Sequence, residues 1–158
     1  MLSQTVDIMK PIVVSTTTDL PRDEVYEFLD VLGNHEPFTD HMLVDWSLDG
    51  PATGVGAKAR MRANALGPKQ WIDMEVVSAS APETIVEEAV SKGGKRRTRG
   101  TYTLSDRDGG GTDIRFQLEY LSMPGSEKLL SPLMRAWLQR ANAKAMERLQ
   151  ERLGNPAP

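Results

Sequence analysis

The sequence predicts an α+β domain in which a curved antiparallel sheet of about seven strands wraps round a long C-terminal helix, with two short helices after the first strand. Three observations predict this class. Apolar and polar residues alternate with a period of two over most of 43–121, and short turns rich in glycine separate the alternating segments. A stripe of apolar residues at helical spacing then runs through 131–153.

The first part of the chain predicts one strand followed by two short helices. Residues 12–18 are β-branched almost throughout, which favours a strand. Apolar residues recur at helical spacing over 21–32, where Pro21 suits a first helical turn and Gly33 ends the helix. Residues 34–40 predict the second short helix, and residues 1–10 are interpreted as a leader that precedes the domain.

Six further strands are predicted at 43–48, 57–64, 70–78, 84–91, 97–105 and 113–121. The connections are short and include Gly50-Pro51, Gly67-Pro68, Lys92–Lys95 and Gly109–Gly111. Short turns join antiparallel neighbours, so these strands form a meander. One face is apolar, and the other carries opposite charges on neighbouring strands, which is typical of a solvated outer face. The interleaved acids count against a basic binding patch.

The last element is the longest helix. Ser131 and Pro132 suit the N-cap and the first helical position, and the stripe of Leu133, Met134, Trp137 and later apolar residues extends to Leu153. At this length the helix spans about 33 Å, enough to cross a domain. A curved sheet that holds one long helix is a helix-grip fold, so we expect one such domain over 11–154 and a short tail at 155–158.

Composition excludes several classes of function. The chain has no Cys and only two His in 158 residues, which excludes disulfides, thiolate sites and a His-rich metal site. Its net charge of −3 is unsuited to non-specific nucleic-acid binding. It contains no apolar run of the roughly 18 residues that a membrane span requires. We therefore expect a cytoplasmic protein with no metal, no cofactor, no nucleic-acid partner and no integral membrane association, either a monomer or a homodimer.

The apolar face raises the question of a cavity. Small residues (Ala57, Ala59, Ala63) lie beside Met61 on one strand, and large aromatic residues are predicted on the same face. Such a mixture suits a pocket for an apolar ligand, and it also suits a filled core. Periodicity alone leaves both interpretations open.

The chain resembles the polyketide cyclase/dehydratase-like members of the SRPBCC superfamily, which includes START domains and the birch-pollen allergen. The resemblance runs over about 11–153. It rests on the strand that passes through Asp19-Leu20-Pro21 into 25–29, on the segment from Trp46 to Gly56, and on the terminal helix. It implies a deep cavity between sheet and helix. The residues expected to contact a ligand there are His35, Phe38, Trp46, Met61, Met74, Tyr102, Phe116, Leu118, Tyr120, Met134 and Trp137.

Few residues suit acid–base chemistry. His35 and His41 flank Pro37 and Phe38 in the segment after the first helix, and an imidazole titrates near neutral pH. Glu87 and Glu88 are adjacent, so a regular strand turns one of them inward. If Val86 and Val90 belong to the core, the inward carboxylate is Glu88. Arg97 or Arg99 is its partner if the strand register differs from the one assigned above. His41 and Glu88 are therefore the candidate catalytic residues, although either His also suits a surface role and a bulge would let both glutamates reach solvent.

The expected function is binding or transfer of an apolar or amphipathic small molecule, such as a lipid, an isoprenoid or a polyketide-like compound. Such a function needs only the pocket. One alternative is an enzyme of the polyketide cyclase/dehydratase type that uses acid–base groups in the cavity. Another is a regulatory module that binds a protein partner through its charged sheet face or its helix.

Overall fold

The computed structural model of the protein describes residues 9–64 and 70–154. Most of the predicted leader, the predicted turn at Gly67-Pro68 and the predicted tail at 155–158 lie outside the described residues.

The elements follow the predicted order. The strands are β1 (Ile12–Thr18), β2 (Leu43–Asp49), β3 (Lys58–Ala63), β4 (Trp71–Ser80), β5 (Thr84–Ser91), β6 (Arg96–Asp106) and β7 (Thr112–Ser122). The α-helices are α1 (Arg22–Asp30), α2 (His35–Thr39) and α3 (Ser131–Gly154). Three short 3₁₀ segments are η1 (Leu32–Asn34), η2 (Lys92–Gly94) and η3 (Gly125–Leu130).

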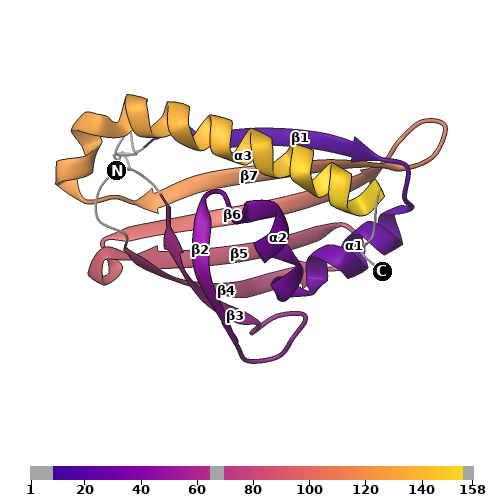
Figure 1. Ribbon diagram of the computed structural model, residues 1–158, viewed down its shortest axis with the longest axis horizontal. Coiled ribbons are helices and arrows are strands. Elements are labelled where there is room, and N and C mark those ends of the chain that lie inside the picture. Colours follow the sequence, from indigo (N-terminus) through magenta and orange to yellow (C-terminus); the bar gives the residue numbers. More distant parts are fainter. Residues whose placement is uncertain (1–8, 65–69, 155–158) are drawn as a thin grey trace, which may run out of the picture.

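All seven strands form one antiparallel sheet in the order β1-β7-β6-β5-β4-β3-β2. The first strand thus joins the last one and leaves the meander from β2 to β7 in sequence order. Figure 1 shows α3 running along β1 across the length of the sheet, with α1 and α2 over the same concave side. In contacts, α3 packs against β1 and α2. The predicted α+β helix-grip fold is therefore confirmed.

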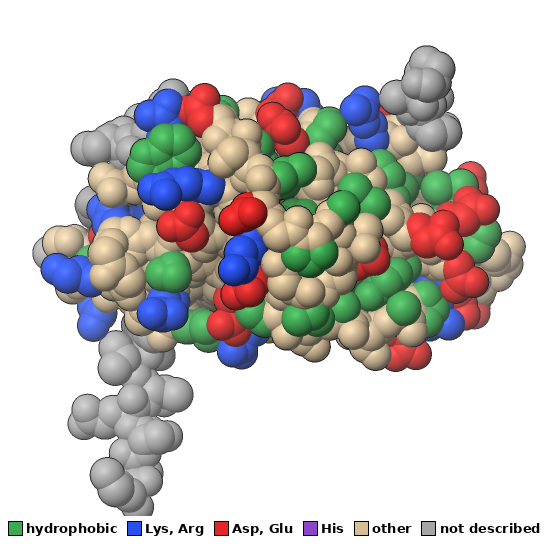
Figure 2. Space-filling model, turned by 90° about the horizontal axis from the view of Figure 1, so that it is seen from below, with side chains coloured by type: hydrophobic (Ala, Val, Ile, Leu, Met, Phe, Trp, Pro, Cys, Tyr) green, Lys and Arg blue, Asp and Glu red, His purple; other side chains and the backbone are tan. Residues whose placement is uncertain are grey.

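The outer, convex face of the sheet carries paired charges, as the sequence predicts. Lys58 faces Glu75 across β3 and β4, and Arg60 faces Asp73 in the same pair of strands. On the side of the molecule seen in Figure 2, basic and acidic side chains alternate over one half, while acidic side chains gather at one end. Exposed pairs of this kind contribute little to stability but keep the face hydrated.

The buried stripe of α3 is shorter than predicted. Leu133 is 74% exposed, and the buried positions begin only at Leu138. From there the buried residues continue to Leu153 at spacings of three and four. The first two turns of α3 therefore cover the sheet less completely than the rest of the helix.

Among the described residues, no helix combines the length and the apolar composition that crossing a membrane requires.

Candidate functional site

The apolar interior has a closed end and a half-open end. At the closed end, side chains such as Val25, Leu29, Ile114 and Leu149 are fully buried between the sheet, α1 and the second half of α3. Other apolar side chains pack against the core but stay partly exposed. Met9 precedes β1, Leu20 precedes α1 and Phe28 lies on α1, whereas a larger group lies toward the first half of α3. We call this larger group the half-open end, and its members are Leu43, Trp46, Ile72, Ala89, Leu118, Tyr120, Met134 and Trp137.

The ligand-binding residues expected from the sequence divide between these two regions. Trp46, Leu118, Tyr120, Met134 and Trp137 belong to the half-open end. The others lie deeper and are buried: His35, Phe38, Met61, Met74, Tyr102 and Phe116. All eleven therefore belong to the interior, and none of them lies on the charged outer face.

Trp46 reaches the interior through an irregularity in β2. The pairing of β2 with β3 shifts register between Val44 and Ser47, and Asp45 adopts a positive φ of 58°. Such a bulge re-aims the side chains around it. As a result Asp45 pairs with Arg62 at the surface, while Trp46 packs against the core.

A buried polar cluster lies under α2. His35 is 2% exposed and Glu87 is 9% exposed, and Glu87 Oε2 lies 3.8 Å from His35 Nδ1. The other ring nitrogen, His35 Nε2, lies 2.7 Å from the Leu29 carbonyl oxygen. Tyr102 and Phe38 enclose the imidazole, with ring centroids 5.5 and 5.4 Å from it. His35, Glu87 and Tyr102 are therefore three titratable groups that meet between α2 and the sheet.

Burial holds both members of the pair neutral near neutral pH. Removal from water raises the pKa of Glu87 to about 8. It lowers the pKa of His35 to about 4, although the hydrogen bond to the Leu29 carbonyl opposes this shift. Burial, and then the nearby Glu87 carboxylate, raise the pKa of the Tyr102 hydroxyl. A neutral carboxyl can donate one proton, and a neutral imidazole can accept one.

Gly100 makes room for this cluster. It pairs with Glu87 across β5 and β6. A Cβ at this position would lie 2.9 Å from the Phe116 ring and 3.2 Å from Glu87 Oε1. A side chain at position 100 would therefore clash with the Phe116 ring and the Glu87 carboxyl.

The structure corrects the orientation of β5. The sequence favoured Glu88 as the inward carboxylate, but Glu87 is the buried one. The Glu88 side chain is 38% exposed and accepts two hydrogen bonds of 3.1 Å from Arg99. Ile85, Glu87 and Ala89 face inward, while Val86 and Val90 lie on the other face. Since β5 carries branched apolar residues on both faces, its own pattern did not determine its orientation.

His41 links α2 to α3. Its Nε2 lies 2.8 Å from the Ala141 carbonyl oxygen, and Arg148 Nη1 lies 2.9 Å from its Nδ1. A carbonyl only accepts, so Nε2 carries the proton and Nδ1 accepts from the guanidinium. Arg148 also pairs with Asp40 at 2.6 Å. Both ring nitrogens are therefore engaged, and the structure does not bring His41 together with Glu87 or Glu88.

A second ionic cluster borders the half-open end. Glu127 of η3 is 7% exposed and forms ion pairs with Lys92, at 2.7 Å, and with Arg96. Burial alone would raise the pKa of Glu127, but the two cations outweigh it and hold the pKa below its usual range. This cluster connects the segment before α3 to the β5–β6 turn.

Within the half-open end, the Tyr120 hydroxyl donates a hydrogen bond to Met134 Sδ at 3.7 Å.

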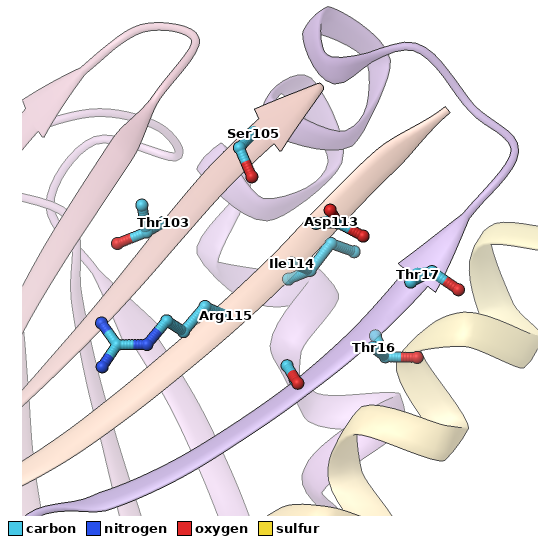
Figure 3. A pocket seen from close by; sticks show the side chains of 8 residues that line it. Thr16, Thr17, Thr103, Ser105, Asp113, Ile114 and Arg115 are labelled. Atoms are coloured by element: carbon cyan, nitrogen blue, oxygen red, sulfur yellow. The ribbon is translucent and has the colours of Figure 1, made fainter. Parts of the chain in front are cut away.

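Two hollows also occur on the convex face of the sheet. The smaller, about 430 Å³, is lined by hydroxyl and charged side chains of β1, β6 and β7 (Figure 3). Thr103, Asp113 and Arg115 project into it from neighbouring strands. The larger lies over β2 to β6, among the paired charges. Neither lining is the apolar surface that the family resemblance implies. In the described part of the chain, no three His, Asp or Glu side chains cluster as metal ligands.

Sequence reasoning missed Glu87 and Gly100. The signal for Glu87 was present, because one of two adjacent glutamates in a strand has to face the interior. For Gly100, the available signal was a glycine within a strand, which indicates close approach of another group.

The concave sheet, the long helix laid across it and the apolar interior between them define a helix-grip domain. The chain belongs to the family described as polyketide cyclase / dehydrase and lipid transport, whose model matches residues 9–154. The family resemblance stated from the sequence is thereby confirmed. A search of curated proteins finds no match.

Solved structures share this fold. TTHA0849 from Thermus thermophilus is 22% identical with a TM-score of 0.71, and the match covers 91% of this chain and 97% of that one. Ara h 8.0201 is 13% identical with a TM-score of 0.65, over 92% and 99% of the two chains. DynU16, from the dynemicin biosynthetic locus, is 19% identical with a TM-score of 0.65, over 96% of this chain and 49% of that one. At these identities the likeness shows the fold alone.

Proposed function

We propose that the protein binds an apolar or amphipathic small molecule between the concave face of the sheet and α3, with the half-open end as its binding surface. One observation carries this proposal: apolar side chains that pack against the core, including Trp46, Tyr120 and Trp137, stay partly exposed at one end of the interior. Membership of a family described by polyketide cyclisation and lipid transport supports it.

The physical reason is the cost of leaving this surface in water. Burial of apolar surface is favourable by about 25 cal/mol per Å². Core-packed side chains that remain partly exposed therefore gain free energy when an apolar molecule covers them. Three of them are aromatic or sulfur-containing residues on one wall (Tyr120, Met134, Trp137), and Met adapts to ligands of varied shape. A lipid, an isoprenoid or a polyketide-like compound fits this surface. We also propose that the protein is cytoplasmic.

The three tryptophans allow a direct test. Trp46 and Trp137 belong to the half-open end, whereas Trp71 lies on the outer face under Arg60 and Arg62. Dibromostearic acid quenches tryptophan fluorescence at contact, and stearic acid serves as its unquenching control. We expect strong quenching in the wild type and in Trp71→Phe.

The doubly substituted Trp46→Phe/Trp137→Phe protein retains only Trp71, so we expect little quenching there. Quenching that depends on Trp71 instead would place the lipid on the outer face and refute the proposal. Absence of binding to any long-chain compound, together with recovery of a stable protein complex, would favour the partner-binding alternative.

A second candidate function is a cyclase- or dehydratase-type enzyme. The observation that favours it is the buried His35–Glu87 pair, because a carboxyl with a pKa of about 8 is a proton donor near neutral pH. In this version of the hypothesis Glu87 takes the role that the sequence had suggested for Glu88. A test is turnover of a linear polyketone by the wild type and by Glu87→Gln. Equal turnover by the two proteins would remove Glu87 from the chemistry.

A further inference from the structure

A buried carboxyl oxygen faces the His35 ring without a hydrogen-bond partner. Glu87 Oε2 has no hydrogen-bond partner, although it is shielded from solvent. His35 Nδ1 lies 3.8 Å away, which is too far for a direct hydrogen bond. Buried polar groups are nearly always paired, so this gap requires an explanation.

The donor and acceptor roles at the gap follow from the surroundings. His35 Nε2 lies 2.7 Å from the Leu29 carbonyl oxygen, which can only accept, so Nε2 carries the ring proton. In the neutral imidazole, Nδ1 then offers a lone pair toward Glu87. Because burial keeps Glu87 protonated near neutral pH, its carboxyl offers an O–H.

One further oxygen atom can satisfy both groups. Two atoms 3.8 Å apart can each lie about 2.8 Å from a common third atom, which is ordinary hydrogen-bond geometry. That third atom has to accept from the Glu87 carboxyl and donate to His35 Nδ1. A hydroxyl does both, whereas a carbonyl or an ether oxygen only accepts.

The gap also lies beside the half-open end. On the inner face of β5, Glu87 is one step along the strand from Ala89, which is partly exposed. Across the sheet, Glu87 pairs with Gly100, which in turn pairs with Leu118 of the half-open end. Along this row Gly100 contributes no side chain, and the Phe116 ring lies over it beside the Glu87 carboxyl.

We propose that His35 Nδ1 and Glu87 Oε2 together bind a hydroxyl group of the ligand. The inference rests on the ligand binding proposed above and specifies its chemistry: an apolar molecule that carries an alcohol, phenol or enol. The hydroxyl lies at the deep end of the ligand, and the apolar remainder covers the half-open end.

The test compares β-naphthol with its methyl ether, which keeps the oxygen but cannot donate. We expect the wild type to bind β-naphthol about tenfold more tightly in calorimetric titration at pH 7. Glu87→Met removes the donor, so the preference should disappear. Glu87→Gln retains an N–H donor and should keep most of it. Glu88→Gln, one residue away on the outer face, is the matched control and should bind as the wild type does.

A second measurement does not depend on any variant folding. The chain has only two His, so the imidazole nitrogen resonances of His35 can be assigned with one His41 variant. We expect β-naphthol to shift the resonance of His35 Nδ1, and the methyl ether to leave it near its ligand-free position.

The outcomes distinguish failure of the hydroxyl site from failure of apolar ligand binding as a whole. Equal binding of both naphthalenes, or a preference that survives in Glu87→Met, would overturn the hydroxyl site and leave apolar ligand binding intact. An unchanged Nδ1 resonance in the presence of bound β-naphthol would overturn it too, because a water would then fill the gap. If neither naphthalene nor dibromostearic acid binds, both the hydroxyl site and the proposed function fail.

Discussion

The buried carboxyl of Glu87 should make the stability of the protein fall as the pH rises above neutrality. In the folded protein the pKa of Glu87 is about 8, against 4.5 for an ordinary glutamate. Between these values the folded state holds a proton that the unfolded chain has released. Stability therefore decreases with rising pH across this window.

His35 limits the pH range over which the contribution of Glu87 to stability can be measured. Its pKa is about 4 in the folded protein, against 6.5 for an ordinary histidine, so between those values the unfolded chain binds the extra proton. That contribution raises stability with pH and opposes Glu87 below pH 6.5. From pH 6.5 to about 8 only Glu87 of these two groups acts, and one proton corresponds to about 1.4 kcal/mol per pH unit, or roughly 2 kcal/mol over the window.

Urea unfolding followed by circular dichroism, repeated across this pH range, measures the effect. Glu87→Gln is neutral at every pH, so its stability should stay level from pH 6.5 to 8 while that of the wild type falls. Glu88→Gln should fall in parallel with the wild type, since its carboxylate is exposed and paired with Arg99. A wild type and a Glu87→Gln protein with parallel pH profiles would refute the assignment of Glu87 as a buried, protonated group.

Three further substitutions test the packing around the site by urea unfolding. Gly100→Ala should destabilise the protein by about 1–3 kcal/mol, because the new Cβ would lie 2.9 Å from the Phe116 ring. Glu127→Gln should cost about 1–3 kcal/mol near neutral pH, because it leaves two cations without their buried partner; this difference should shrink as the pH falls through the lowered pKa of Glu127. His41→Leu should cost about 1–2 kcal/mol, because it removes the hydrogen bond to the Ala141 carbonyl.

Gly125→Ala is the control for Gly100→Ala. Gly125→Ala adds a methyl group where nothing lies within 4 Å, so its stability should stay near that of the wild type. A Gly100→Ala protein as stable as Gly125→Ala would contradict the close approach at position 100. A loss in Glu127→Gln that is independent of pH would show that its carboxylate is not the partner of the two cations. An unchanged stability in His41→Leu would mean that the link between α2 and α3 contributes nothing.

Most of the fold could be predicted because its signals are local. The alternation in residues 113–121 and the Ser131-Pro132 helix start each depend on neighbours a few residues away, and β7 and α3 lie there. The N-cap role predicted for Ser131 is wrong, because Ser131 is itself helical and its hydroxyl donates to the Lys128 carbonyl oxygen. Trp46 and the other apolar residues expected in the interior are also there. The prediction for α3 was weaker at its start, since Leu133 is exposed there.

The site was harder to predict because its members come from distant parts of the chain. His35 follows α1, Glu87 lies in the middle of β5, and the two meet only when α2 packs on the sheet. His41 likewise looked suited to acid–base chemistry, but α3 brings Ala141 and Arg148 to its two ring nitrogens. The local periodicity of the sequence predicts neither of these contacts.

By itself, the sequence determined the order of strands and helices and an interior free of cysteine, since spacing and composition are properties of the chain alone. It also indicated that either Glu87 or Glu88 faces the interior. The tertiary structure decided that Glu87 is the buried one. In β5 both faces are apolar enough to be buried, so the neighbouring strand set the orientation: Arg99 opposite Glu88 holds one carboxylate in solvent, and Gly100 opposite Glu87 leaves space for the other inside.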